Sequence, residues 1–443
     1  MIKIPTQVKT VLDKLEQAGH EAFMIGGCIR DSIMGIEPKD YDVTTSARPD
    51  ETKAVFQGYP VIETGMKHGT VTVVIDEMPI EITTYRVDGN YADNRHPQKV
   101  RFTTSLQEDA ARRDFTINAI AYNPRVGIVD YFGGLEDIEA GVIRCVGEPA
   151  KRFEEDALRI MRALRFSSVS GFKIEEKTAE AAVDCRGLLR KISVERIREE
   201  LVKLLCGKDA QRILLEYTEI LGVVLPELLE MRGFQQQNPH HIYDVLKHTA
   251  VAVSNVPPEA DLRLGALFHD IGKPRCFSVD DEGIGHFYGH GKISGEMARD
   301  ILNRLKFDNV TKDRVITLVI AHDAVIEDTE KSVKRALNRL SPAMFFKLIA
   351  LKRADNVAQN PKYSYRQSYY DRLESMAKEI IEKEECFSLK DLAVRGGDLL
   401  EMGIPPGKTI GQVLEKLLEA VIAGEVANEK EELLKKVIAF SKS

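Results

Sequence analysis

The pattern of the chain changes near residue 147, and this change constrains the fold more than any other feature. Residues 1 to about 140 alternate short apolar strands with helices and with turns rich in glycine and proline, as in a mixed α+β domain. From Lys151 onward the apolar residues recur at helical spacing almost to the C-terminus. The sequence therefore predicts a multidomain α+β protein, with an α+β head followed by all-α domains.

Two polar interruptions, at residues 235–239 and 359–362, read as linkers and divide the helical part. A chain of 443 residues is long enough for several domains. We predict four of them: a head at 1–140, a helical neck and body at 141–235, an all-α domain at 236–358 and a helical tail at 359–443.

Composition narrows the class of protein. The net charge is −7, but residues 141–205 carry 14 lysines and arginines against 11 acids, a local surplus that suits RNA. The six cysteines are scattered, with no Cys-x-x-Cys, so we expect reduced thiols. No segment approaches the roughly 20 apolar residues that span a bilayer, and the N-terminus does not read as a signal peptide. We expect a cytoplasmic protein with no membrane contact and no obligate protein partner.

Two acids separated by one residue, Asp40 and Asp42, follow the first strand. Alternate side chains of an extended chain share a face, so both carboxylates should point the same way, with Tyr41 and Val43 in a core. Such carboxylates repel each other unless a cation lies between them, and Mg²⁺ prefers oxygen ligands and substrate phosphates. The pair therefore suggests phosphoryl transfer; the alternative is a solvated strand end.

A glycine turn lies just upstream of this pair. Gly26 and Gly27 follow an apolar strand at residues 22–25 and precede a helix, so the turn can present backbone N–H groups to a phosphate. Residues 70–84 read as a hairpin that carries a third acid, Glu81, on its polar face. Three acids on adjacent strands beside a phosphate turn indicate a two-metal polymerase-type site.

Two arginine-rich segments follow. Arg112 and Arg113 are expected to enter a helix, where their guanidinium groups could neutralise a triphosphate; the alternative is a surface pair capped by Glu108 and Asp109. A later segment places one acid and three arginines at helical spacing: Asp156, Arg159, Arg162 and Arg165. The alternative for this segment is a solvated helix face with an Asp–Arg pair.

Together these segments resemble the class II tRNA nucleotidyltransferase and bacterial poly(A) polymerase family. The matching segments are Gly26-Gly27-Cys28-Ile29-Arg30-Asp31, Asp40-Tyr41-Asp42, residues 112–119, residues 130–135 and residues 155–159. All five occur in the family's order. The resemblance implies a head like that of DNA polymerase β, followed by helical neck and body domains.

The resemblance also implies roles for single residues. Asp40 and Asp42 would hold catalytic Mg²⁺, with Glu81 as a third acid. The nucleotide-binding set would be Gly26, Gly27, Arg30, Arg112, Arg113, Asp156, Arg159, Arg162 and Arg165. Within this set Asp156 and Arg159 would pair with the incoming base, since a carboxylate and a guanidinium can satisfy C and A but leave polar groups unpaired against G and U.

The expected reaction is the template-independent addition of CCA to tRNA 3′ ends from CTP and ATP. Residues 84–97 are similar to the mobile loop that CCA-adding members keep and CC-only members lack. Poly(A) addition and A-only addition remain alternatives, because those enzymes share the head motifs.

A second motif lies in the third predicted domain, where residues 240–356 hold seven of the ten histidines. An ordered set of side chains resembles the ligands of HD-domain phosphohydrolases: His248, His269, Asp270, His290, His322 and Asp355. The resemblance implies a divalent transition metal (Ni, Mn, Co or Fe) or Mg²⁺, with His290 and His322 supporting a second ion. A metal-activated water there could hydrolyse phosphomonoesters or 2′,3′-cyclic phosphates.

These ligands allow two rival hypotheses from other classes. One is an HD phosphohydrolase whose head only senses nucleotide, and the other is an RNA-binding scaffold without catalysis. The start of the predicted tail interleaves tyrosines and arginines, at Tyr363, Tyr365, Arg366, Tyr369, Tyr370 and Arg372. Such a pattern suits either RNA stacking or helix packing, and we predict that the tail binds tRNA.

Overall fold

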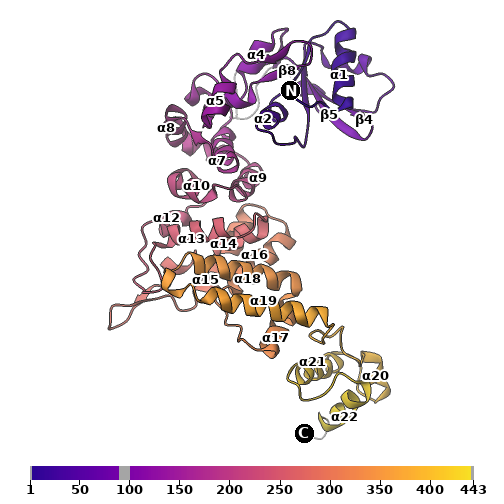
Figure 1. Ribbon diagram of the computed structural model, residues 1–443, viewed down its shortest axis with the longest axis vertical. Coiled ribbons are helices and arrows are strands. Elements are labelled where there is room, and N and C mark those ends of the chain that lie inside the picture. Colours follow the sequence, from indigo (N-terminus) through magenta and orange to yellow (C-terminus); the bar gives the residue numbers. More distant parts are fainter. Residues whose placement is uncertain (1, 89–99, 441–443) are drawn as a thin grey trace. The chain divides into compact units, whose positions relative to one another are not determined.

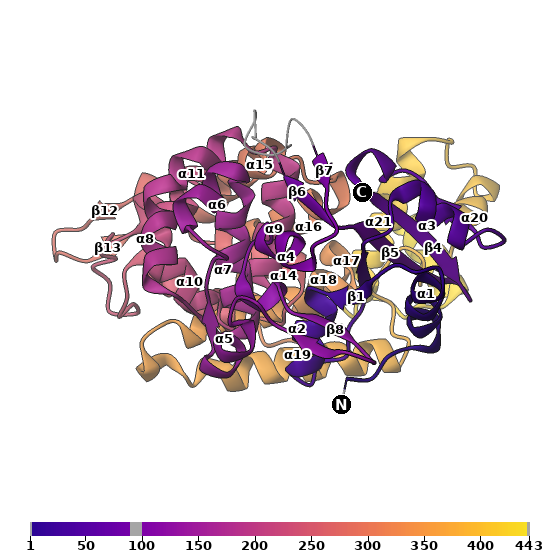
Figure 2. The ribbon, with the colours of Figure 1, turned by 90° about the horizontal axis from the view of Figure 1, so that it is seen from above.

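The computed structural model describes residues 2–88 and 100–440, and its contacts divide the chain into two units, Met1–Leu229 and Glu230–Ser443 (Figures 1 and 2). The first unit contains a sheet and a group of helices. The second is helical apart from one short hairpin.

A seven-stranded sheet forms the centre of the first unit. Its strands, in spatial order, are β3 (Val61–Ile62), β4 (Thr70–Ile75), β5 (Met78–Thr84), β2 (Asp42–Thr45), β1 (Ala22–Ile25), β8 (Ala121–Asn123) and β9 (Gly127–Val129). Neighbouring strands are antiparallel, except that β2 runs parallel to β5. The predicted hairpin at residues 70–84 is confirmed as β4 and β5.

Three helices belong to this sheet: α1 (Thr6–Gln17), α2 (Gly27–Ile33) and α3 (Pro49–Val55). Helix α1 buries Val8, Val11, Leu12 and Leu15, the spacing of one helical face. These side chains share a core with strand residues that include Val43. The strand side chains that face this core are apolar, and the polar side chains of the site lie at the other strand positions.

The rest of the first unit is mostly helical. Its elements are η1 (Met66–His68), β6 (Arg86–Asp88), β7 (Val100–Phe102), α4 (Leu106–Ala111), η2 (Thr116–Asn118), α5 (Gly134–Ala140), β10 (Val142–Ile143), α6 (Pro149–Glu155), α7 (Leu158–Ser170), β11 (Lys173–Ile174), α8 (Glu176–Asp184), η3 (Cys185–Lys191), α9 (Val194–Leu205), α10 (Ala210–Glu216), α11 (Thr218–Val224) and α12 (Glu227–Met231).

Two local expectations for this part are wrong. Arg112 caps the C-terminus of α4, so the arginine pair leaves a helix rather than entering one. Asp156 caps the end of α6 in an extended conformation and is not on the helix that carries Arg159, because the chain breaks between α6 and α7.

The second unit is built from helices that pack around the histidine-rich segments. Its elements are α13 (Val245–Asn255), α14 (Ala260–Phe268), η4 (Lys273–Arg275), β12 (Ser278–Val279), β13 (Gly285–His286), α15 (His290–Arg304), α16 (Asn309–Ala321), α17 (Glu330–Leu340), α18 (Pro342–Val357), η5 (Pro361–Tyr363), α19 (Arg366–Glu382), α20 (Gly396–Glu401), α21 (Lys408–Ile422) and α22 (Lys430–Phe440).

Helices α14 and α18 each contact α13 and α16 and also contact each other, and α19 packs along α18 (Figure 1). The last three helices have a small apolar core of their own, which includes Leu399, Leu417 and Leu433. An α+β head followed by helical domains was predicted, and this fold class is confirmed.

Candidate active site

The glycine turn that was predicted to bind phosphate (the phosphate turn) follows the end of the first strand. Gly26 follows β1 with φ +86° and caps the N-terminus of α2. A Cβ built at Gly26 would lie 2.9 Å from Nη1 of Arg113, so the turn and this arginine are closely packed. The backbone conformation requires glycine here, and any side chain would also have to displace the end of the Arg113 side chain.

Two of the three predicted acids pair on the sheet, and the third precedes one of its strands. The parallel register of β2 and β5 pairs Asp42 with Glu81, and paired residues of neighbouring strands project from the same face. Asp40 lies in a bend just before β2. Burial raises the pKa of the Asp42 carboxyl to about 6; Arg113 opposes the shift, and the charges of Glu81 and Asp40 add to it. A cation between these oxygens would relieve that repulsion, and a divalent metal therefore fits the donor set.

A buried acid, Asp109, holds the two predicted arginines in place. The sequence analysis considered it only as a possible cap. Asp109 is fully buried and pairs with Arg112 at 2.8 Å and with Arg113 at 3.7 Å. It also accepts hydrogen bonds from the Thr44 hydroxyl on β2 (3.0 Å) and from the backbone N–H of Arg86 (3.3 Å). Although burial opposes it, the two arginines hold the pKa of Asp109 below its ordinary value. The arginine pair is thus fixed to the sheet and is not a loose surface pair.

A chain of polar contacts joins the phosphate turn to α7. Arg30 donates from Nη1 to the side-chain oxygen of Asn118 (2.6 Å), and Asn118 donates to the carboxylate of Asp114 (3.0 Å). Nε of Arg162 donates to the other oxygen of Asp114 at 2.7 Å. Burial opposes ionisation, but Arg162 and Asn118 together hold the pKa of Asp114 well below its usual range. Asn118 and Asp114 are therefore structural partners of two predicted nucleotide-binding arginines.

The side chains predicted to read the base have other protein partners in this structure. Asp156 forms a two-pronged ion pair with Arg196, at 2.8 and 3.3 Å. Arg159 is buried, and its guanidinium contacts the carboxylate of Glu155 (2.9 Å) and the carbonyl oxygens of Arg152 and Arg112. The sequence analysis did not identify Arg196, because its partner Asp156 lies 40 residues away and no local sequence pattern connects the two.

Arg165 is also held within the protein. Its Nε lies 2.7 Å from Glu200, and its guanidinium stacks 3.8 Å from the centre of the Phe166 ring. Arg30 and Arg162 lie near the same ring, at 4.8 and 5.3 Å. Phe166 therefore brings together three of the predicted arginines, and it was not among the predicted site residues.

The predicted second set of ligands converges in the other unit. Nε2 of His248 lies 2.9 Å from Asp355 and 3.2 Å from Oδ2 of Asp270, and Nε2 of His269 lies 3.2 Å from that same Oδ2. The other oxygen of Asp270 lies 3.4 Å from His290 and 3.6 Å from His322. Asp270 therefore lies between two groups of ligands, and each group falls within 4.8 Å.

The orientation of the rings identifies which nitrogen can bind a metal. Each of the four rings directs Nδ1 at a backbone carbonyl oxygen: His248 at Ala358 (3.2 Å), His269 at Ala266 (2.7 Å), His290 at Phe287 (2.9 Å) and His322 at Val319 (2.6 Å). A carbonyl only accepts, so we assign the proton to Nδ1 and the lone pair to Nε2. Such an N–H···O=C contact is the usual outer support of a metal-bound histidine.

The lone pairs then face each other in two close pairs. Nε2 of His248 lies 3.3 Å from Nε2 of His269, and the corresponding distance between His290 and His322 is 3.0 Å. Burial disfavours protonated His248, but its hydrogen bonds to Asp270 and Asp355 raise its pKa to about 9. The ammonium of Lys273 also lies 2.7 Å from Oδ2 of Asp270, so one cation is already present beside these donors. The remaining nitrogen and carboxylate donors suit a divalent transition metal.

The predicted mobile loop at residues 84–97 is described only in part. Residues 84–88 form the end of β5 and strand β6, and residues 89–97 lie outside the described part of the chain. The six cysteines form no disulfide in the described part of the chain.

Comparisons with known proteins agree with this geometry. Family profiles match three segments: "Poly A polymerase head domain" at residues 22–144, "Probable RNA and SrmB- binding site of polymerase A" at 171–231, and "tRNA nucleotidyltransferase domain 2 putative" at 280–437. The CCA-adding enzyme of Lactobacillus delbrueckii subsp. bulgaricus is 36% identical over 429 residues, covering 96% of this chain and 95% of the relative. The chain belongs to the CCA-adding enzyme family.

Other family members support this membership. The CCA-adding enzyme of Bacillus velezensis is 33% identical and covers 96% of this chain and 95% of the relative. The structure of the Bacillus stearothermophilus CCA-adding enzyme in complex with CTP matches 99% of this chain and 98% of its own, with a TM-score of 0.73 and 29% identity. The resemblance drawn from the motifs is confirmed, whereas the HD assignment stays a prediction.

Membership in this nucleotidyltransferase family implies a divalent metal in the head, and the acids on β2 and β5 fit it. Among the described residues, none of the helices combines the length and the apolar character needed to cross a bilayer.

Proposed function

We propose that this family member adds CCA to tRNA 3′ ends, using CTP and ATP. The observation that supports the proposal is the parallel register of Asp42 and Glu81, which lie near the same end of the sheet as the Gly26 turn. The names of relatives that match almost the whole chain support the same reaction. Poly(A) addition and A-only addition are the alternatives that the first experiment separates.

In the proposed reaction the tRNA 3′-hydroxyl oxygen forms a bond to the α-phosphorus, and the bond from this phosphorus to the oxygen of the leaving pyrophosphate breaks. Asp40 and Asp42, with Glu81 beside them, would hold Mg²⁺, which would activate the hydroxyl and stabilise the leaving group. The backbone of Gly26 and Gly27 would cradle the triphosphate. Arg30, Arg112 and Arg113 would neutralise its charge; Asp109 and Asn118 orient them.

Base selection is proposed to fall to Asp156 and Arg159. Because Arg196 and Glu155 hold these side chains in the structure, an incoming base would have to compete for the same donors and acceptors. A base that satisfies them replaces the lost bonds, and one that does not leaves buried polar groups unpaired. Arg162 and Arg165 would support this side of the pocket.

The neck and body at 141–235 and the tail at 359–443 are proposed to hold the tRNA by shape and phosphate contacts. The match of residues 171–231 to an RNA-binding profile supports the first of these. Because tRNA is processed in the cytoplasm, we propose this location as well.

Primer extension on tRNA lacking its 3′ end tests the main proposal. With CTP alone the product should grow by two residues, with CTP and ATP by three, and growth should then stop. Resolution of the products on a sequencing gel measures this directly. Long A tails with ATP alone, or growth by A only, would instead support the alternatives.

The Gly26 turn gives a second prediction. Gly26→Ala forces an L residue into φ +86° and directs a methyl group at Arg113, so we expect nucleotide incorporation to fall by about 10-fold or more and stability by about 1–2 kcal/mol. Gly58→Ala is the matched control, since Gly58 has φ +100° and nothing within 4 Å of a built Cβ. Thermal unfolding and initial rates measure the two effects. Equal losses of activity in both variants would show that backbone strain alone is responsible.

A second function is proposed for the histidine–aspartate cluster, namely metal-dependent hydrolysis of phosphate esters. The observation that favours it is the set of four imidazoles whose Nδ1 atoms face carbonyls while their Nε2 atoms converge on Asp270. Bound cations would supply an activated water. The oxygen of this water would bond to phosphorus while the ester P–O bond breaks, and a proton of the water would pass to the leaving alcohol oxygen.

A further inference from the structure

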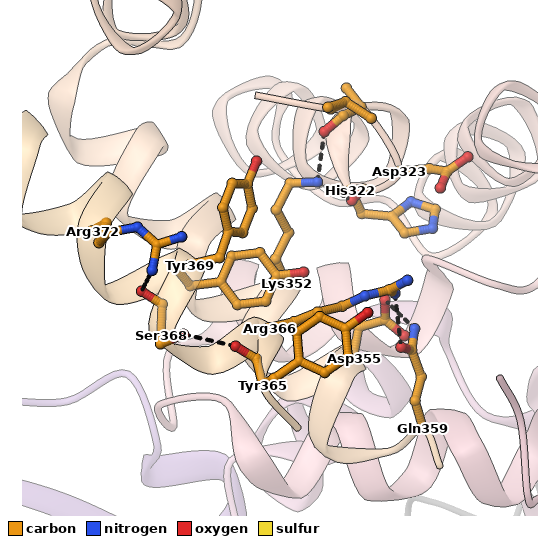
Figure 3. Close-up of a pocket in the computed structure, with 13 residues that line it drawn as sticks. His322, Asp323, Lys352, Asp355, Gln359, Tyr365, Arg366, Ser368, Tyr369 and Arg372 are labelled. Carbon is orange, nitrogen blue, oxygen red and sulfur yellow. Dashed lines mark hydrogen bonds between the residues drawn. The ribbon is translucent and has the colours of Figure 1, made fainter. Parts of the chain in front are cut away.

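A cavity of about 390 Å³ lies in the first unit, and its volume falls within the range of small-molecule sites. It is formed by the residues that follow β2, by β7 with the turn after it, and by α4. A larger cavity in the second unit, of about 610 Å³, has His322 and Asp355 in its wall and so belongs to the histidine–aspartate cluster (Figure 3). The cavity in the first unit has no role in either proposed reaction.

This cavity lies on the same face of the sheet as the acids, but apart from them. Ser46, in its wall, continues the pairing of β2, because its backbone N–H donates to the carbonyl oxygen of Glu21 (3.0 Å). Alternate residues share a face, so Ser46 lies on the side of Asp42 and Thr44, about 13 Å along the strand from Asp42. Between them, the Thr44 hydroxyl donates to Asp109, so helix α4 covers the sheet at that point. The cavity is therefore separate from the proposed nucleotide site.

The side chains of the cavity wall leave a net positive charge. Arg48 and Arg101 are exposed, and both line the cavity. Among the side chains that the structure describes, neither of them has an ion-pair partner, whereas the arginines around the acids pair with carboxylates. The carboxylate in the wall belongs to Glu108, and it accepts a hydrogen bond from the Thr103 hydroxyl. Two guanidinium groups and one carboxylate give the wall a net charge of +1.

Hydroxyl groups and an aromatic ring complete the wall. Oγ of Ser46 accepts the backbone N–H of Glu21 (2.9 Å), so its own proton can be donated to a ligand. Thr104 is exposed and offers a second hydroxyl. The Phe102 ring packs against Gly69, where a built Cβ would lie 2.8 Å from Cε1 of the ring. Guanidinium and hydroxyl groups bind phosphate oxygens, and an aromatic wall suits the sugar or base of a nucleotide.

We propose that this cavity binds a phosphodiester of the tRNA backbone, with Arg48 and Arg101 on the phosphate oxygens and Phe102 against the adjoining sugar. A phosphodiester carries one negative charge, which matches the net charge of the cavity, whereas the triphosphate of a nucleotide carries several. A free polyphosphate offers the same oxygens, and the experiment below distinguishes the two. The proposal rests on the first proposed function, because it adds a contact to the tRNA that this function requires.

Binding of tRNA lacking its 3′ end to the full-length protein, measured without nucleotide over a range of salt concentrations, tests the proposal. We expect the double variant Arg48→Gln/Arg101→Gln to bind about 10-fold more weakly at low salt, and the slope of log affinity against log salt to fall by about 1 to 2. In steady-state assays the KM for tRNA should rise, while kcat and the KM for CTP stay within about twofold. Arg125→Gln is the matched control, since Arg125 is 65% exposed and does not line the cavity.

A charge-preserving variant, Arg48→Lys/Arg101→Lys, should restore most of the salt slope, because both positive charges return. Unchanged affinity and slope in the glutamine variant would overturn the proposal. A higher KM for CTP with unchanged tRNA binding would overturn it too, and would assign the cavity to a free polyphosphate. If the wild-type protein binds tRNA through Arg48 and Arg101 but incorporates no nucleotide, the first proposed function fails while the cavity proposal stands.

Discussion

Replacing Asp42 by asparagine is expected to lower the rate of nucleotide incorporation by at least about 10³-fold. Asparagine keeps the shape of the side chain but removes the charge that would hold the metal beside Asp40 and Glu81. The Asp42 carboxylate is unfavourable in the metal-free fold, since burial raises its pKa to about 6. Removing that charge should therefore leave the melting temperature unchanged or higher, so a loss of activity cannot be ascribed to unfolding.

The matched control for this variant is Asp50→Asn. Asp50 is an exposed acid in the first turn of α3 and belongs to neither β2 nor β5, so its replacement should leave the rate within about twofold. Incorporation is measured with radiolabelled CTP on tRNA lacking its 3′ end, across a range of Mg²⁺ concentrations. If Asp42→Asn retains incorporation at the wild-type rate, the assignment of the metal site is wrong.

Local patterns were sufficient to predict the elements that carry the site. The apolar run at residues 22–25, the glycines after it and the alternation at 70–84 each specify a strand, a turn or a hairpin without reference to the rest of the chain. The parallel pairing of β2 with β5 has no such local signal. It brings Asp42 next to Glu81 across 39 residues, and only the assembled sheet shows it.

The partners of the predicted arginines could not be found in this way. Arg196 pairs with Asp156 and Glu200 pairs with Arg165, each across more than 30 residues. Arginines and glutamates on a helix show the same sequence pattern whether they are exposed or form ion pairs with distant residues. The sequence analysis noted Asp109 but interpreted it as a cap of a surface arginine pair. An acid three residues before an arginine gives the same sequence pattern whether the acid is exposed or buried. The break before α7 was missed for a related reason. Its apolar spacing continues through Asp156, and only the backbone shows that the helix stops there.

The histidine–aspartate cluster illustrates the opposite case. Its six ligands are spread over 107 residues, and no spacing rule connects them; the ordered resemblance alone suggested that they belong together. The structure adds what that resemblance did not contain, namely the carbonyl partner of every ring and the position of Asp270 between the two groups. From these details we predict that the cluster holds two cations, one in each group of ligands.

Replacing Asp270 by asparagine is expected to weaken divalent metal binding at both groups by more than about 100-fold, since each carboxylate oxygen faces one group. Mn²⁺ at about 100 times its dissociation constant should stabilise the wild-type protein by about 2.7 kcal/mol and should have little effect on the variant. Metal content after gel filtration and melting temperature with and without Mn²⁺ measure both effects. Asp280→Asn is the matched control, because Asp280 is an exposed acid that pairs with His286 outside the cluster.

His290→Gln separates the two groups within the cluster. It removes one ligand from the group with His322 and leaves His248, His269 and Asp355 in place, so we expect the bound Mn²⁺ to fall from two ions to one. Phosphate release should be lost in Asp270→Asn, whereas incorporation of CTP should persist, because the acids that would support it belong to the other unit. If Asp270→Asn binds Mn²⁺ as tightly as the wild type, the converging rings are a buried hydrogen-bonded cluster that a proton satisfies, and the second function fails. If His290→Gln still binds two ions, the group with His322 is not a metal site, and the second cation must lie elsewhere.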